Sequence, residues 1–290
     1  GSITNAAREL CVTQPAISRL LSQTEQQLGL ALFHRHRGRL QATPEAHALL
    51  VEIDRARESA ERVNELARAL AEQRAGSLRV ACSPSLAQAL VPRALAMMGT
   101  RHPDVAVKLR SSLVATLVSE VLNDDVEVGV SALPADHPNL NTAPLCTGNM
   151  VAIVPRHSPL ATRPKLGLED LGGHPMIVIG RQMHFGRIVI EAFRRSSVPL
   201  REWADVPYSQ LACSLVNSGA GVSIVDPFSV LDSRWPNLVV RPLRQRIAIN
   251  VTLLTARTRP MSLVGAAFCR LLEQVCSASR KDLRQVPVVA

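Results

Sequence analysis

A group of hydrogen-bonding side chains lies near the start of the chain, in the segment TQPAISRLLSQ at residues 13–23. On a helix, residues three or four positions apart share a face, so several of these groups project to the same side. Glutamine pairs with adenine edges, arginine with guanine edges, and serine or threonine with bases or phosphate, while an apolar side chain can contact a thymine methyl. The segment therefore predicts a helix that reads base edges in DNA. The candidate residues are Thr13, Gln14, Pro15, Ser18, Arg19 and Gln23.

The alternative interpretation of this segment is an ordinary helical corner with a solvated polar face. Local signals predict a first helix capped by Thr4, then a second helix with Thr13 as its N-cap and Pro15 in its first turn. Apolar residues of the second helix are expected to be buried, namely Ala16 or Ile17, together with Leu20, Leu21 and Leu28. The basic turn RHRGR then places Arg35, Arg37 and Arg39 around a glycine, as suits a β-wing that contacts phosphates. Together and in this order, the signals favour the DNA-reading interpretation.

A long helix is predicted after Pro44, because residues 45–74 contain neither glycine nor proline and are rich in strong helix formers. Apolar residues recur there at alternating spacings of four and three, which is the seam of a paired helix. The seam consists of Leu49, Ile53, Ala56, Ala60, Val63, Ala67 and Leu70. A single long core helix is the alternative, but the length, seam and flanking charges favour a dimerisation element.

Beyond Gly76 the sequence alternates between strand and helix patterns. Strands are predicted at residues 77–84, 105–112, 126–133, 150–155, 176–180, 202–207, 221–227 and 250–256, with helices at 86–98, 116–122, 187–195, 210–218 and 263–275. This alternation indicates mostly parallel α/β sheets. Two such series suggest two lobes with a ligand cleft between them and crossovers near 150–155 and 249–254. Ligands of such sheets bind beyond the carboxyl ends of the strands.

The first 46 residues resemble the winged helix-turn-helix of LysR-type transcriptional regulators. The resemblance is carried by Gly1 to Thr4, the Ala6-Ala7 pair, Thr13 to Arg19, Glu25 to Gly29, Leu32 to Arg35 and the Thr43-Pro44 pair. Thr24 and Ala46 depart from the family pattern, which has leucine and glycine there. The family also places a helix before the Gly-Ser pair with which this sequence starts, so the winged domain is expected to be truncated.

The resemblance extends over the whole chain and implies its organisation. We expect a winged helix-turn-helix DNA-binding domain at residues 1–43, a linker and dimerisation helix at 44–75, and a bilobed, periplasmic-binding-protein-like effector domain at 76–290. Lobe 1 is expected at residues 76–150 and 251–290, and lobe 2 at residues 151–250. The implied protein is a bacterial transcriptional regulator that binds double-stranded DNA and self-associates as a dimer or tetramer.

The resemblance further implies a small effector bound between the lobes by residues that follow strand ends. These are Ser83, Pro84, Ser85, Ser131, Met183, His184, Tyr208, Asp226 and Pro227. Hydroxyls and N–H groups at 83–85 suit a carboxylate, and Asp226 suits an ammonium or guanidinium. The segment VNSGAGVSIVDP (216–227) resembles a subgroup that senses basic amino acids, diaminopimelate or opines, so an amino-acid-like effector is expected.

Composition is consistent with this interpretation and disfavours others. The net charge of +9 permits an acidic partner, and the 3% aromatic content argues against base-stacking RNA platforms. Six scattered cysteines predict free thiols in a reducing cytoplasm, with no metal site or cofactor. A solute-binding module or a bilobed enzyme are the alternatives. The first needs an export signal, and for the second we find no nucleophile-elbow, phosphate-loop or HExxH motif.

Overall fold

The computed structural model describes residues 2–36, 39–71, 76–231 and 235–279. The chain forms two compact units, residues 1–71 and residues 72–290. The first unit contains two short helices, a hairpin and a long helix. Their bounds are α1 (Ile3–Glu9), α2 (Gln14–Leu28), β1 (Phe33–His36), β2 (Arg39–Ala42) and α3 (Pro44–Ala71).

The caps of α1 and α2 differ in part from the predicted ones. Ser2, and not Thr4, caps α1, because its hydroxyl accepts a hydrogen bond from the backbone N–H of Asn5 over 3.2 Å. Thr13 occupies the N-cap position of α2 as predicted, but its side chain makes no capping hydrogen bond. Pro15 lies in the first turn of α2, and Gly29 ends the helix in the left-handed conformation with φ 69°.

Two residues of the motifs that resemble the LysR family, Glu25 and Thr43, form hydrogen bonds that position the hairpin and the long helix. Glu25 accepts hydrogen bonds from the N–H groups of Leu32 (2.7 Å) and Phe33 (3.1 Å), which ties the end of α2 to the start of β1. Thr43 is buried, donates to the carbonyl of Ala31 over 3.0 Å, and accepts from the N–H of Ala46 at the start of α3. The motif residues therefore fix the connections between elements.

The predicted burial of the apolar face of α2 is wrong within the first unit. No described residue of α2 is buried, and Leu20 is 60% exposed. In this unit only Ala7 among the described apolar residues is fully buried. Short helices and a two-stranded hairpin offer little surface to cover a helix face, so α2 is held by its ends and by contact with α1.

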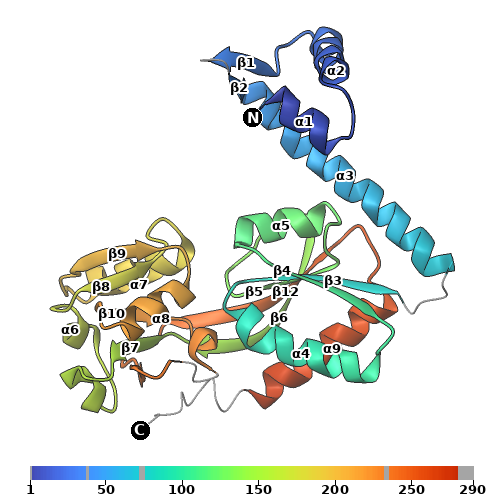
Figure 1. Cartoon of the computed structure of the whole chain (residues 1–290). Coiled ribbons are helices and arrows are strands. Elements are labelled where there is room, and N and C mark those ends of the chain that lie inside the picture. Colours follow the sequence, from blue (N-terminus) through green and yellow to red (C-terminus); the bar gives the residue numbers. More distant parts are fainter. Residues whose placement is uncertain (1, 37–38, 72–75, 232–234, 280–290) are drawn as a thin grey trace. The chain divides into compact units, whose positions relative to one another are not determined.

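The second unit contains two five-stranded sheets, which define two lobes (Figure 1). The first lobe has the strand order β4-β3-β5-β12-β6 and the second β11-β7-β10-β8-β9. The first-lobe strands are β3 (Ser77–Cys82), β4 (Ala106–Ser111), β5 (Val128–Ser131), β6 (Leu140–Asn149) and β12 (Ala248–Ala256). The second-lobe strands are β7 (Val151–Pro155), β8 (Met176–Ile179), β9 (Glu202–Val206), β10 (Val222–Val225) and β11 (Leu238–Pro242).

The prediction of mostly parallel sheets is wrong, because each sheet combines two parallel with two antiparallel pairings among its described strands. The antiparallel pairings come from the strands around the two crossovers. β6 leads into β7 at Met150, and β12 returns the chain from the second sheet to the first. The crossover strands were predicted, but their antiparallel pairing and the strands β6 and β11 were not.

Helices cover both faces of each sheet. In the first lobe, α4 (Leu90–Arg101) and α9 (Leu263–Ala278) lie side by side, and α5 (Val114–Leu122) packs against β5 and β12 (Figure 1). In the second lobe, α6 (Leu168–Leu171) and α7 (His184–Arg195) pack in one apolar cluster and α8 (Ser209–Asn217) in another. Alternating residues of β8 divide between these clusters: Met176 and Val178 join the first, Ile177 and Ile179 the second.

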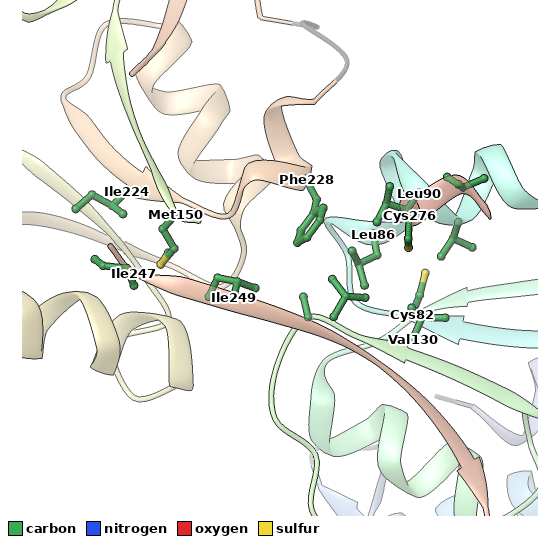
Figure 2. Close-up of a cluster of buried hydrophobic side chains, with 14 of the residues drawn as sticks. Cys82, Leu86, Leu90, Val130, Met150, Ile224, Phe228, Ile247, Ile249 and Cys276 are labelled. Atoms are coloured by element: carbon green, nitrogen blue, oxygen red, sulfur yellow. The ribbon is translucent and has the colours of Figure 1, made fainter. Parts of the chain in front are cut away.

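One apolar core continues from lobe to lobe at the crossovers. Figure 2 shows Met150, Ile247 and Ile249 along the crossover strands, with Phe228 directed toward Leu86. Phe228 belongs to the short helix η3 (Pro227–Val230), and Leu86 begins the short helix η1 (Leu86–Gln88). The contact between η1 and η3 therefore joins the two lobes beside the crossovers.

Candidate functional site

The predicted DNA-reading residues lie at the N-cap of α2 and along its first ten residues. Gln14, Pro15, Arg19 and Gln23 are exposed, and Ser18 is half-buried. Positions 15, 19 and 23 follow at intervals of four and share one face of the helix. Thr13 is also exposed, immediately before the first turn.

The predicted β-wing is present as the antiparallel hairpin β1–β2, with His36 opposite Arg39 and Arg35 opposite Leu40. The backbone thus places Arg35 and Arg39 on neighbouring strands beside the hairpin turn. The side chains of both arginines, and the whole of Arg37, lie outside the described residues. Their role in phosphate contact stays a prediction.

A cavity lies between the two lobes of the second unit, and we call it the interlobe cavity. Its empty volume, including the part open to solvent, is about 450 Å³. The first lobe lines it with Ser83, Pro84, Ser85, Leu113, Val114 and Leu133. The second lobe lines it with Ile179, Met183, Phe185, Pro207, Tyr208, Ser209, Gln210 and Asp226.

The charged group in the lining of this cavity is an acid. The lining residues include one carboxylate, Asp226, and no arginine, lysine or histidine. Most other side chains of the lining are apolar, and the remaining polar ones are hydroxyls and the amide of Gln210. The cavity thus offers an apolar wall with hydrogen-bonding groups around one acid.

Asp226 stands at the end of β10 with its side chain completely buried. Its Oδ2 accepts hydrogen bonds from the hydroxyls of Ser209 (2.6 Å) and Ser229 (3.0 Å), and its Oδ1 accepts from the Ser229 N–H (3.1 Å). The Ser85 hydroxyl from the first lobe is a further hydrogen-bond partner. Burial raises the pKa of Asp226 above its ordinary value, and the serine hydrogen bonds oppose that rise.

Two serines of the first lobe shape the turn after β5. The Ser83 hydroxyl accepts a hydrogen bond from the N–H of Ala132 over 3.0 Å. Ser131 donates its hydroxyl to the carbonyl of Leu133 (2.8 Å) and accepts from the N–H of the same residue (3.1 Å). Ser131 therefore fixes Leu133 in the cavity wall and does not itself line the cavity.

The start of α7 supplies the second-lobe wall opposite that turn. Gly180 adopts φ 56°, and a Cβ on Gly186 would lie 2.4 Å from the Gly180 carbonyl oxygen, so the turn and the helix approach closely. This tight turn presents Met183 and Phe185 to the cavity.

Comparison with known proteins gives the family of this chain. Residues 71–277 match the LysR substrate binding domain, and residues 1–47 match the bacterial regulatory helix-turn-helix protein of the lysR family. The chain belongs to the LysR family of transcriptional regulators. This family consists of regulators and not enzymes, so the expected winged helix-turn-helix, linker helix and bilobed effector domain are the architecture of a LysR-type regulator.

Two relatives and one solved structure support the assignment. The transcriptional activator protein LysR of Escherichia coli (strain K12) is 30% identical over 271 residues, which cover 92% of this chain and 86% of the relative. The octopine catabolism/uptake operon regulatory protein OccR of Rhizobium meliloti is 31% identical, covering 83% and 80%. Full-length CbnR in complex with its target DNA has a TM-score of 0.81 at 25% identity, covering 95% of this chain and 94% of CbnR.

This LysR-family chain therefore binds double-stranded DNA, responds to a small-molecule effector and self-associates.

Within the described residues, no helix combines the length and the apolar character needed to cross a bilayer. Within the described residues, none of the six cysteines forms a disulfide, and burial raises the pKa of Cys82 and Cys269 to about 12. The described residues contain no group of three acidic, histidine or cysteine side chains placed to bind a metal.

Six of the nine predicted effector residues of this LysR-type regulator line the interlobe cavity: Ser83, Pro84, Ser85, Met183, Tyr208 and Asp226. The other three do not line it. Ser131 is turned into its own loop, and Pro227 lies against Gly148, where a glycine Cβ would be 2.6 Å from its ring. His184 begins α7, where burial and the charge of Arg187 lower its pKa.

The sequence missed most of the wall. Leu113, Val114, Leu133, Ile179 and Phe185 carry no signal of their own, because apolar residues at strand ends and helix starts equally suit a core. Gln210 was detectable, since it follows the predicted strand 202–207 just as Tyr208 does, but it was assigned to a helix without a role.

Proposed function

We propose that this regulator is switched by an amino-acid-derived cation bound in the interlobe cavity. The observation that carries the proposal is the lining itself, which holds one buried carboxylate and no cationic side chain. An anionic effector would meet Asp226 without a compensating positive charge. Two unit charges 4 Å apart interact by about 4 kcal/mol at an effective dielectric constant of 20, enough to select the sign of the ligand charge.

The serines define how the cation is held. Because Ser209 donates its hydroxyl proton to Asp226, the lone pairs of its oxygen are free to accept from an ammonium or guanidinium. Ser85, the partner from the first lobe, is placed to do the same. In this proposal Asp226 is a positioning residue that supplies negative charge through the serines, and the serine oxygens make the contact.

The relatives support the class of ligand. OccR is named as the regulator of an octopine catabolism and uptake operon, and it is 31% identical to this chain over 242 residues. The apolar wall formed by Leu113, Val114 and Leu133 suits the methylene chain of such a ligand.

The cavity also provides the switch, because its wall comes from both lobes. A ligand that bridges Ser85 and Ser209 stabilises one separation of the lobes over others. In the cytoplasm, closure of the lobes would be transmitted to a tetramer assembled through α3, with residues 1–43 and 76–290 as its DNA-binding and effector domains.

On the DNA side, we propose that one set of residues contacts bases and another contacts phosphates. The base-contacting residues are Thr13, Gln14, Pro15, Ser18, Arg19 and Gln23, and the phosphate-contacting residues are Arg35, Arg37 and Arg39.

A thermal-shift measurement on the full chain tests the effector proposal. L-lysine and L-arginine, which are cations, are compared with meso-diaminopimelate, which carries two ammonium groups but no net charge, and with L-glutamate. At 100 times Kd a ligand raises the unfolding free energy by about 2.7 kcal/mol. We expect stabilisation by at least one of the two cationic probes and none by L-glutamate. Val114→Trp fills the cavity and should abolish the shift, and Asp226→Ala should remove most of it. Ala115→Trp, on the exposed side of the same helix, should preserve the shift.

Two outcomes would contradict the proposal. The first is stabilisation by L-glutamate with none of the cationic probes, which would show that the cavity selects anions. The second is a ligand shift that survives in Val114→Trp, which would place the effector outside the interlobe cavity. The unliganded Tm of each variant checks that it folds.

A further inference from the structure

Gln210 presents an unusual side chain at the wall of the interlobe cavity. Its amide nitrogen and its amide oxygen are both buried, and neither has a hydrogen-bond partner among the described residues. A buried polar group without a hydrogen-bond partner is destabilising, and native proteins contain few of them. Two such atoms on one amide therefore call for an explanation in terms of what the amide binds.

Gln210 lies where the interlobe cavity meets a second hollow. A second hollow, with an empty volume of about 810 Å³ including open solvent, is lined by Pro84, Ala87, Gln88, Ser111, Leu113, Tyr208 and Gln210. Gln210 is one of the residues shared by this outer hollow and the interlobe cavity, while Asp226 and Ser209 line only the cavity. Gln210 thus lies at the boundary, with the acid on the inner side.

The amide has a defined chemical complement. It offers N–H donors and a carbonyl acceptor side by side, so a ligand group that satisfies both must carry an acceptor next to a donor. The outer hollow, like the cavity, is lined by no arginine, lysine or histidine. A carboxylate that binds here must therefore accept from neutral donors, and the amide N–H groups are available for that purpose.

We propose that Gln210 binds the α-ammonium and α-carboxylate of an amino-acid effector, with the amide nitrogen donating to the carboxylate and the amide oxygen accepting from the ammonium. This inference rests on the proposed function and adds an orientation to it. The side-chain cation enters first and lies toward Ser85, Ser209 and Asp226, while the head group stays at the boundary with the outer hollow. Gln210 is then the residue that distinguishes an amino acid from a simple amine.

Isothermal titration of the full chain tests this orientation. The probes are L-lysine, cadaverine, which lacks the carboxylate, and 6-aminohexanoate, which lacks the α-ammonium. L-arginine and agmatine form a second pair that differs only in the carboxylate. We expect the intact amino acid to bind at least tenfold more tightly than its truncated analogues, a difference of about 1.4 kcal/mol.

Two substitutions of Gln210 separate recognition from a structural role. Gln210→Met keeps the length but removes both polar groups, so the intact amino acid should lose its advantage over the truncated probes. Gln210→Glu replaces the N–H donors by a second acceptor, so it should weaken binding of the amino acid and strengthen binding of cadaverine or agmatine. A merely structural residue would change both in the same direction. Gln274→Glu, at an exposed position of α9, is the matched control and should leave all affinities unchanged.

The outcomes distinguish this inference from the proposed function. If the amino acid binds and Val114→Trp abolishes binding, but Gln210→Met retains wild-type affinity within twofold, Gln210 has no role and the cavity proposal stands. Equal wild-type affinity for an amino acid and its amine would also overturn the head-group contact alone. If no cationic probe binds the wild-type chain, both proposals are wrong.

Discussion

The Ser209 hydroxyl donates a 2.6 Å hydrogen bond to Oδ2 of Asp226, which joins the first residue of α8 to the end of β10. Hydrogen bonding by Ser85 of the first lobe lowers the pKa of the same carboxylate, so this buried acid interacts with residues of both lobes. Because this carboxylate also lines the interlobe cavity, its protonation state affects the stability of the effector domain and, in the function that we propose, the binding of a cation.

Asp226→Asn should change how the free energy of unfolding depends on pH. Burial raises the pKa of Asp226 in the folded state, so the folded state binds more protons than the unfolded state from about pH 3.8 up to the raised value. The contribution of Asp226 to stability is thus complete below pH 3.8 and is lost as pH rises through the folded pKa. Asparagine keeps the shape without this loss. Urea denaturation from pH 4 to pH 8 should therefore show the variant becoming more stable relative to wild type as pH rises.

The control for this measurement is Asp136→Asn, which makes the same chemical change at an exposed position. A difference between Asp226→Asn and wild type that stays constant across this pH range would mean that Asp226 titrates alike in the folded and unfolded chains.

Gly186→Ala should destabilise the effector domain. A methyl group there would lie 2.4 Å from the Gly180 carbonyl oxygen and 2.8 Å from Arg181 Cα, so backbone must move. We expect a loss of about 1–3 kcal/mol in the free energy of unfolding, and weaker effector binding because the same turn carries Met183 and Phe185.

Gly99→Ala is the matched control, since a Cβ there meets nothing within 4 Å. It should stabilise α4 by about 0.5–1 kcal/mol. Urea denaturation and titration with L-lysine check both effects, and equal behaviour of the two variants would contradict the proposed close approach.

The sequence predicted the elements of this fold better than their pairing. Helix α3 was predicted to begin at Pro44, as it does, because helix formers and a sustained seam are local signals. The antiparallel pairing of β12 with β6 was not predicted, because pairing is set by contacts between distant segments. Strand β6 itself was missed: its sequence LNTAPLCTGN contains proline, glycine and asparagine, which are depleted in strands.

The candidate site was predictable where polar residues follow strand ends. Ser85 and Asp226 were found in that way, and both line the cavity. Their bond to each other was not predictable, because it depends on how the two lobes meet. The role that we propose for Gln210 was not predictable either, because it rests on a buried, unpartnered amide beside the cavity, which has no counterpart in a sequence pattern.

Glutamate substitutions on the seam of α3 should dissociate the oligomer. Ile53 and Val63 lie on the predicted seam and are 59% and 67% exposed within the first unit, so each presents an apolar surface that a second copy of the helix would cover. Ile53→Glu combined with Val63→Glu places like charges at the paired positions, and sedimentation equilibrium should show a smaller assembly. Val51→Glu, equally apolar and exposed but off the seam, should keep the wild-type mass. An unchanged mass for the double variant would exclude α3 as the pairing helix.

Arg19→Ala should weaken specific DNA binding with little change in its salt dependence. Arg19 is exposed on the face of α2 that we propose to read DNA, and a bidentate contact to a guanine would contribute about 1–3 kcal/mol of discrimination. Loss of a base contact leaves the slope of log K against log salt nearly unchanged, whereas loss of a phosphate contact lowers that slope by about one.

Binding sites that the wild-type protein selects from random DNA serve as the specific target. Gel shifts at several salt concentrations then compare wild type, Arg19→Ala and Arg57→Ala, the last removing the same charge from α3, where Arg57 pairs with Glu61 over 3.2 Å. We expect Arg57→Ala to bind as wild type does. If Arg19→Ala instead binds selected and random DNA with equally reduced affinity and a lower slope, Arg19 contacts phosphate and the base-reading role falls to the other exposed residues of α2.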